Sequence, residues 1–210
     1  MEFITKPMEI ETKSMEIIAP FLTKLQLPEA ETKVYSRIIH AAGDVEYASV
    51  IKIHPQAIAA AQAALKSGCN IYTDVEMVRT GINKKKLASF GGQVECLIAD
   101  SAVAERAKEA GITRSMAAMR SFGKKLEGSI VAIGNAPTAL FEVLRLMRQE
   151  NIRPAVIVGI PVGFVGAADS KAELVETSPV PYVTVTGTKG GSPIAAAVVN
   201  AMMYLLDNRR

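Results

Sequence analysis

Residues 130–138 read IVAIGNAPT, and the order of residue types in this stretch decides the fold that the sequence predicts. An apolar, largely β-branched run ends at Gly134, and Pro137 then opens a helical pattern. Glycine turns follow two later strand-like runs as well, at residues 159–166 (GIPVGFVG) and 187–193 (GTKGGSP). Because the carboxyl ends of parallel strands meet at one edge of a sheet, we expect the three turns to lie together.

The sequence contains five strand-like runs in all. They span residues 69–73, 94–99, 129–133, 155–160 and 182–186. Helical patterns separate these runs, at residues 101–110, 136–150 and 171–177, and a helix of small residues is expected at 193–206. Strands that alternate with helices predict a three-layer α/β fold, with a mainly parallel five-stranded sheet and helices on both faces.

The N-terminal third of the chain is helical in pattern throughout. Helices are expected at residues 14–25, 29–42 and 55–67, with Ser14 as the capping residue of the first. This region is expected to decorate the sheet. Because no linker, repeat or low-complexity tract divides the chain, we expect a single domain over residues 1–210.

Composition limits the classes of function. The chain is 5% aromatic, lacks Trp and carries a net charge of +3, which argues against a nucleic-acid partner and suits an anionic small molecule. Its apolar runs are too short for a membrane span, and charged residues interrupt its first positions, so no signal peptide is expected. Cys69 and Cys96 lack metal-ligand spacing and are expected to be buried thiols, which suggests a cytoplasmic protein without a metal site.

The three glycine turns are expected to form one site for a large anionic ligand. Glycine allows positive φ angles and close approach to a ligand, and helix N-termini offer free N–H groups. A nucleotide fits poorly, because no turn reads GxGxxG or a Walker motif and no acidic residue follows at the ribose-binding spacing. Lys189, next to Gly190, is expected to be a flexible cation beside open backbone amides, which suits carboxylates.

Histidine occurs only twice, at His40 and His54. His54 precedes a proline at a helix boundary and is expected to be a surface or capping residue. His40 lies at the end of a helical pattern that Gly43 stops, and a helix C-terminus favours the imidazolium form. Arg37 lies one turn earlier on the same helix face and can bind a carboxylate. These residues alone allow His40 to be either a structural or a catalytic residue.

Two further polar positions interrupt apolar surroundings. Asp74 follows the first strand of the predicted sheet, where it either caps the next helix or lies beside a ligand at the carboxyl edge. Arg114 opens another predicted helix and is either a solvated charge or an anion ligand. The sequence leaves both alternatives open.

Six motifs together resemble the precorrin-8X methylmutases of cobalamin biosynthesis. They are, in order, RIIHAAGD, TDVEMVRTGI, GITRSMAAM, GNAPTAL, PVGFVGAADSK and GTKGGSPIAAAVVNAM, and they begin at Arg37, Thr73, Gly111, Gly134, Pro161 and Gly187. The resemblance implies an isomerase that moves a methyl group from C11 to C12 of precorrin-8X or its cobalt complex, giving hydrogenobyrinate or cobyrinate. It also implies a five-stranded parallel α/β fold, usually a homodimer, and a rearrangement that needs no redox cofactor, metal ligand or covalent nucleophile.

The resemblance further implies roles for individual residues. His40 takes the role of the proposed acid, and Ser14 matches the family's N-terminal serine. The carboxylate arms of the tetrapyrrole substrate would be held by cationic side chains, by the first and third turns, and by hydroxyl groups; the candidates are Arg37, Arg114, Lys189, Asn135, Gly190, Ser14 and Thr138, with Asp74 nearby. Residues 161–165 would supply an apolar floor. Asp169 stands where the family often has Glu, so a substrate contact there is left open.

Two other classes of function compete with this interpretation. One is a nucleotide-dependent oxidoreductase, which the missing fingerprint disfavours. The other is a non-catalytic corrinoid carrier, which needs the same pocket as a methylmutase. The sequence does not distinguish a cobalt-loaded from a metal-free substrate.

Overall fold

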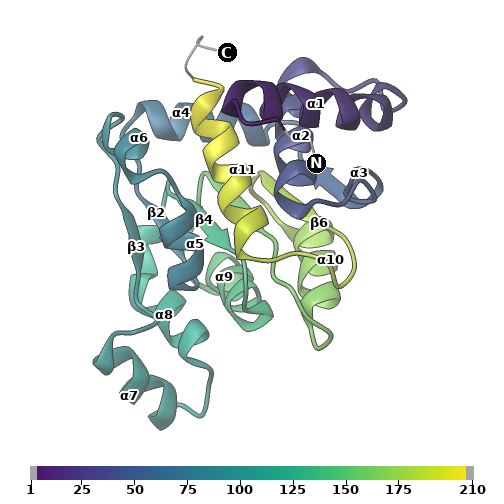
Figure 1. The fold of residues 1–210 in the computed structure, drawn as a ribbon. Helices are drawn as coiled ribbons and strands as arrows, with labels where there is room; N and C mark the ends of the chain where they lie inside the picture. The colour runs from purple at the N-terminus through teal and green to yellow at the C-terminus, as the bar shows by residue number, and fades with distance from the viewer. Residues whose placement is uncertain (1–3, 207–210) are drawn as a thin grey trace.

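The computed structural model describes residues 4–206, which are arranged in layers around one sheet (Figure 1). Within that range the sheet has six strands, in the spatial order β1-β6-β5-β4-β2-β3. The strands are β1 (Ile51–Ile53), β2 (Ile71–Thr73), β3 (Val94–Cys96), β4 (Ile130–Ile133), β5 (Val156–Gly159) and β6 (Tyr182–Val185). Strands β2 to β6 pair in parallel, as the sequence predicts, and β1 is antiparallel to β6 at the edge.

The sixth strand, β1, corrects the expected count of five. It reads Ile-Lys-Ile and lies between two helices, so no apolar run marks it as a strand in the sequence. Its register on β6 pairs Ile51 with Val185, and Ile51 packs into the core. Lys52 points to solvent, which suits the edge of a sheet.

Helices surround the sheet on both faces. They are α1 (Pro7–Thr23), α2 (Glu29–Ala42), α3 (Tyr47–Val50), α4 (Ala57–Lys66), α5 (Glu76–Gly81), α6 (Lys84–Ala88), α7 (Ser101–Glu109), α8 (Arg114–Phe122), the 3-10 helix η1 (Gly123–Leu126), α9 (Pro137–Glu150), α10 (Ala167–Thr177) and α11 (Ser192–Tyr204). Proline begins or nearly begins α1, α9 and α11, where its missing N–H and fixed φ are favourable.

Two helix starts differ from the sequence prediction. Helix α1 begins at Pro7, so Ser14 lies inside the helix and caps nothing; its hydroxyl donates to the Ile10 carbonyl at 2.8 Å. Helix α10 begins at Ala167 rather than at residue 171. Both predictions were late by at least one turn, because the charged residues in these segments obscured the apolar stripe.

Two apolar cores lie on opposite faces of the sheet. In β4, Ile130 and Ala132 pack with α2, α4, α5 and α11, whereas Val131 and Ile133 pack with α7 to α10. Apolar residues on both faces explain why the parallel strands read as continuous apolar runs. The small-residue helix α11 lies across the first face (Figure 1) and packs closely, since a Cβ on Gly81 would come within 2.8 Å of the Ala196 Cβ.

The carboxyl ends of β2, β4, β5 and β6 meet at one edge of the sheet. Chain order reverses between β2 and β4, because β3 continues to one side of β2 and β4 returns to the other. Ligands of open α/β sheets bind at such a reversal. Over residues 4–206, no helix is long and apolar enough to cross a membrane.

Candidate active site at the carboxyl edge of the sheet

Asp74 fills the position between β2 and β4. Its side chain is fully buried, and its carboxylate accepts hydrogen bonds from the backbone N–H groups of Gly134 (2.9 Å), Asn135 (2.9 Å) and Ala136 (2.7 Å). Burial raises the pKa of the Asp74 carboxyl, and the three N–H donors oppose that rise. Asp74 therefore stabilises the N-terminal turn of α9 across the sheet instead of capping α5, whose N-cap residue is Val75.

This arrangement corrects the expected role of the first turn. The N–H groups from Gly134 to Ala136 already have an acceptor, so they are not open to a ligand. The side chain of Asn135, however, is exposed. The Asp74 carboxylate is itself fully buried, so a ligand on the surface cannot reach it.

The second and third turns are hydrogen-bonded to each other and packed closely. Gly163 donates its N–H to the Thr188 carbonyl at 3.2 Å, and Gly191 donates to the Ile160 carbonyl at 3.0 Å. Gly190 has a φ of 156°, and a Cβ there would lie 2.5 Å from the Pro161 carbonyl oxygen. Only glycine permits this approach. The turns lie together, as predicted. The Gly191 N–H, however, already donates to a carbonyl of the protein and is not open to a ligand.

Lys189 is bound, which corrects the expectation of a flexible cation. Its Nζ donates to Asp44 Oδ2 at 2.5 Å and to Glu46 Oε2 at 2.8 Å, and it lies 5.3 Å from the Tyr47 ring centroid. These hydrogen bonds raise the pKa of Lys189 above its usual value and lower the pKa of Asp44. Two carboxylates therefore neutralise the cation that was expected to meet a ligand.

His40 lies in the last turn of α2, as predicted. Gly43 ends the helix in the left-handed conformation, with a φ of 63°, and donates its N–H to the carbonyls of Ile39 and His40. The His40 side chain is exposed. Asp44 follows the cap directly, so its bond to Lys189 brings the third glycine turn beside the helix end that carries His40.

Arg37 and Arg114 differ in what surrounds them. The Arg37 guanidinium donates to Glu11 Oε1 of α1 at 2.6 Å and lines a groove of about 650 Å³ between α1, α2 and α11. Arg114 is exposed at the start of α8. The hydroxyls of Thr113 and Thr138 lie 2.9 Å apart, which brings the N-terminus of α8, and with it Arg114, beside the first turn.

A family model described as precorrin-8X methylmutase matches residues 9–205. The chain belongs to this family. A cobalt-precorrin-8 methylmutase of Priestia megaterium is 40% identical over 97% of this chain and 90% of its own length. A precorrin-8X methylmutase of Sinorhizobium sp is 41% identical over 96% of each chain.

A solved structure agrees with the family assignment. The precorrin-8x methyl mutase of Thermus thermophilus superposes with a TM-score of 0.86 at 36% identity, covering 94% of this chain and 95% of that one. The interpretation of the six motifs is thereby confirmed, and so is the class of enzyme, since methylmutases are isomerases. Relatives named for cobalt-precorrin-8 and for precorrin-8X are about equally similar to this chain, so percentage identity does not distinguish the two substrates.

One buried residue beside the third turn was not predicted from the sequence as a site residue. Lys171 of α10 is 1% exposed, and its Nζ donates to the backbone carbonyl of Lys189 at 2.5 Å. Burial lowers the pKa of Lys171 to about 8. Once α10 is known to start at Ala167, the spacing of Ala167, Lys171 and Leu174 places all three on one buried stripe. A sequence prediction that began α10 at Ala167 would therefore have predicted that Lys171 is buried.

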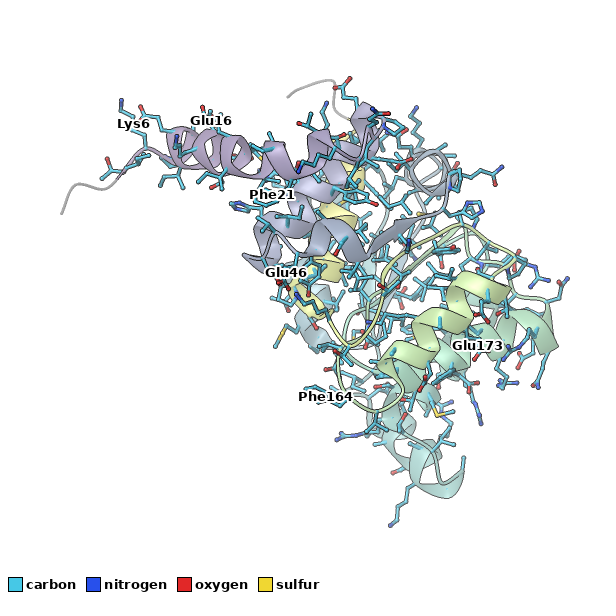
Figure 2. The ribbon with its side chains drawn as sticks, turned by 90° about the vertical axis from the view of Figure 1, so that its right-hand side faces the viewer. Lys6, Glu16, Phe21, Glu46, Phe164 and Glu173 are labelled. Carbon is cyan, nitrogen blue, oxygen red and sulfur yellow. The ribbon has the colours of Figure 1, made fainter. Side chains whose placement is uncertain are left out.

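The apolar loop between β5 and α10 stands out from the surface. Phe164 is 95% exposed and Val165 is 90% exposed. In Figure 2, Phe21, Glu46 and Phe164 lie along one side of the molecule, and α1 projects beyond that side with Lys6 and Glu16 on its outer part. Ser14 belongs to this projecting helix. An apolar loop, the Glu46–Lys189 ion pair and the projecting helix α1 therefore lie along the same side of the molecule (Figure 2).

Proposed function

We propose that this chain catalyses the migration of a methyl group from C11 to C12 of precorrin-8X or its cobalt complex, giving hydrogenobyrinate or cobyrinate. The observation that carries the proposal is the family match over residues 9–205. The shift is intramolecular: the C11–methyl bond breaks, the C12–methyl bond forms, and the composition of the macrocycle does not change. Any cobalt belongs to the substrate.

We infer that His40 is the general acid. A proton that His40 gives to a ring nitrogen, or a hydrogen bond that it donates there, makes the migration terminus more electron-poor. A transferred proton returns to His40 after the shift. The exposed ring of His40, in the last turn of α2, is accessible to a macrocycle. General acid catalysis typically contributes ~10²–10⁴-fold to a rate.

The carboxylate arms of the substrate need cations and hydrogen-bond donors. Arg114 is the best-supported ligand, because it is exposed beside the first turn. The exposed side chain of Asn135 and the hydroxyl of Thr138 lie at that same turn. Arg37 and Lys189 already pair with carboxylates of the protein, so a substrate carboxylate would compete with these partners. Loop residues 161–165 offer the apolar surface that a flat macrocycle requires.

We also infer that the working enzyme is a homodimer. A pocket usually buries most of a bound ligand, yet His40 lies on an open surface of the single chain. Helix α1 exposes large apolar side chains, including Met8, Ile17 and Phe21. A second copy that covers these side chains would enclose the substrate and would bring its own α1, with Ser14, to the site.

We infer that the protein is cytoplasmic, because the free thiols of Cys69 and Cys96 fit a reducing compartment. We also infer that residues 1–210 form one domain.

The proposal is tested by incubating the protein with precorrin-8X and with its cobalt complex. We expect the visible spectrum to change while the mass of the macrocycle stays constant. A corrinoid carrier would bind the macrocycle and release it unchanged. An oxidoreductase would bind a nicotinamide nucleotide in calorimetry, which we do not expect. The substrate that turns over faster identifies the natural form.

A further inference from the structure

Lys171 has an unusual environment for a lysine. Its side chain is 1% exposed, and the partner of its ammonium is a backbone carbonyl rather than a carboxylate. Burying an ammonium without an opposite charge costs free energy, and an apolar side chain of similar length would pack at a lower cost. Stability alone therefore does not account for a lysine at this position.

The third turn, which Lys171 contacts, is rich in glycine. The third turn contains Gly187, Gly190 and Gly191, with φ angles of 72°, 156° and 125°. Glycines have the widest choice of backbone conformation, so such a turn needs external contacts to keep one shape. Lys171 supplies one of them, at the carbonyl of Lys189 in the middle of the turn.

The side chain of Lys189 continues the connection. Its Nζ bonds both Asp44 and Glu46, and Asp44 also accepts the Glu46 N–H at 2.8 Å. These residues follow Gly43, which ends the helix that carries His40. A continuous series of contacts thus leads from α10, through the third turn, to the helix end that carries His40.

We propose that Lys171 and Lys189 are paired positioning residues: Lys171 fixes the backbone of the third turn, and Lys189 fixes the end of α2 to that turn. His40 then keeps its place relative to the turns that hold the substrate. Neither lysine touches the substrate in this role; Lys171 is buried, and Lys189 is engaged by two carboxylates. The inference rests on the proposed function, in which His40 is the acid.

The first test needs no turnover. The chain has two histidines, so NMR of the unliganded protein gives two imidazole signals, and His54 serves as an internal reference. We expect Lys171→Met and Lys189→Met to shift or broaden the His40 signal while the His54 signal stays in place. Lys33→Met is the matched control, because Lys33 is an exposed lysine of the same helix α2 that pairs with Glu29. A His40 signal that responds to neither variant overturns the proposal.

The second test separates positioning from substrate binding. Small misplacements of a catalytic group reduce turnover strongly, so we expect kcat to fall about 10–100-fold in Lys171→Met and in Lys189→Met, with KM changed less than about three-fold. Lys189→Arg keeps the ion pairs and should restore most of kcat. Because the two lysines act in series, the double variant should be no slower than the slower single variant.

Three kinetic results would overturn the proposal. They are unchanged kcat in both variants, a rise in KM alone for Lys189→Met, and losses that multiply in the double variant. The absence of turnover in the wild-type protein would instead overturn the proposed function, and the NMR test would still decide the positioning role. Thermal melting of each variant confirms that the fold is intact.

Discussion

At the scale of single residues, the buried ammonium of Lys171 makes stability depend on pH. Its pKa is about 8 in the folded protein, against a usual value of 10.5. At neutral pH both states are protonated, and the folded state bears the full cost of the buried charge. As pH rises from about 8 to 10.5, the folded state releases its proton first, so that cost disappears.

We therefore predict that Lys171→Met changes the pH dependence of unfolding. Relative to the variant, the wild-type protein should gain about 3 kcal/mol in free energy of unfolding between neutral pH and pH 10.5. Urea titrations of both proteins at several pH values measure this difference. A constant difference across that range would show that Lys171 keeps an ordinary pKa.

Gly190 should tolerate no side chain. In Gly190→Ala the Cβ would meet the carbonyl oxygens of Pro161 at 2.5 Å and Ile160 at 2.7 Å, both of which belong to the backbone. We expect the second and third turns to separate, with a loss of about 2–4 kcal/mol in unfolding free energy and of most activity. Gly187→Ala is the control, since its Cβ meets open space and only its φ of 72° is unfavourable. Equal effects in thermal melts would contradict the proposed interlocking.

At the scale of elements, Asp74 joins β2 to the N-terminus of α9. Asp74→Asn replaces one carboxylate oxygen by an amide nitrogen, so at least one backbone N–H from Gly134 to Ala136 loses its acceptor. We predict a loss of about 2–4 kcal/mol in the free energy of unfolding, measured by urea titration. In Asp100→Asn the amide can still cap α7, so a change under about 0.5 kcal/mol is expected. Equal losses would show that ordinary capping explains Asp74.

The elements also show how far sequence reasoning reaches. The parallel strands, the glycine turns, the end of α2 at Gly43 and the buried helix α11 follow from local patterns in the chain. Strand β1 does not, because Ile51–Ile53 has a lysine in its middle and forms no apolar run, and its pairing with β6 is long-range. The use of the turn amides by Asp74 was missed for the same reason, since the partners are 60 to 62 residues apart.

The charge balance of the site was equally hidden. Lys189 and Asp44 are 145 residues apart in the chain, and only the packing of the third turn against the end of α2 brings them together. The sequence therefore predicts Lys189 as a candidate site residue but does not predict its two carboxylate partners. Lys171 needed an accurate helix start, and boundaries are the least predictable feature of a helix.

At the scale of the whole molecule, the projecting helix α1 points to a second copy of the chain. We expect sedimentation to give about twice the 22.4 kDa mass of one chain. A charge in the exposed apolar stripe should weaken this association, so Ile17→Asp combined with Phe21→Asp should sediment as a monomer and lose activity. Val175→Asp, on the outer face of α10, should leave both unchanged. A monomeric wild-type protein that is fully active would contradict the inference.

The central claim is that His40 supplies the proton for the methyl shift. The most direct measurement compares the rate of precorrin-8X isomerisation in His40→Ala and in His54→Ala, with binding of the macrocycle followed in parallel. We predict that His40→Ala binds the macrocycle and isomerises it at least about 100-fold more slowly, whereas His54→Ala resembles the wild-type protein. Wild-type rates in His40→Ala would contradict the assignment.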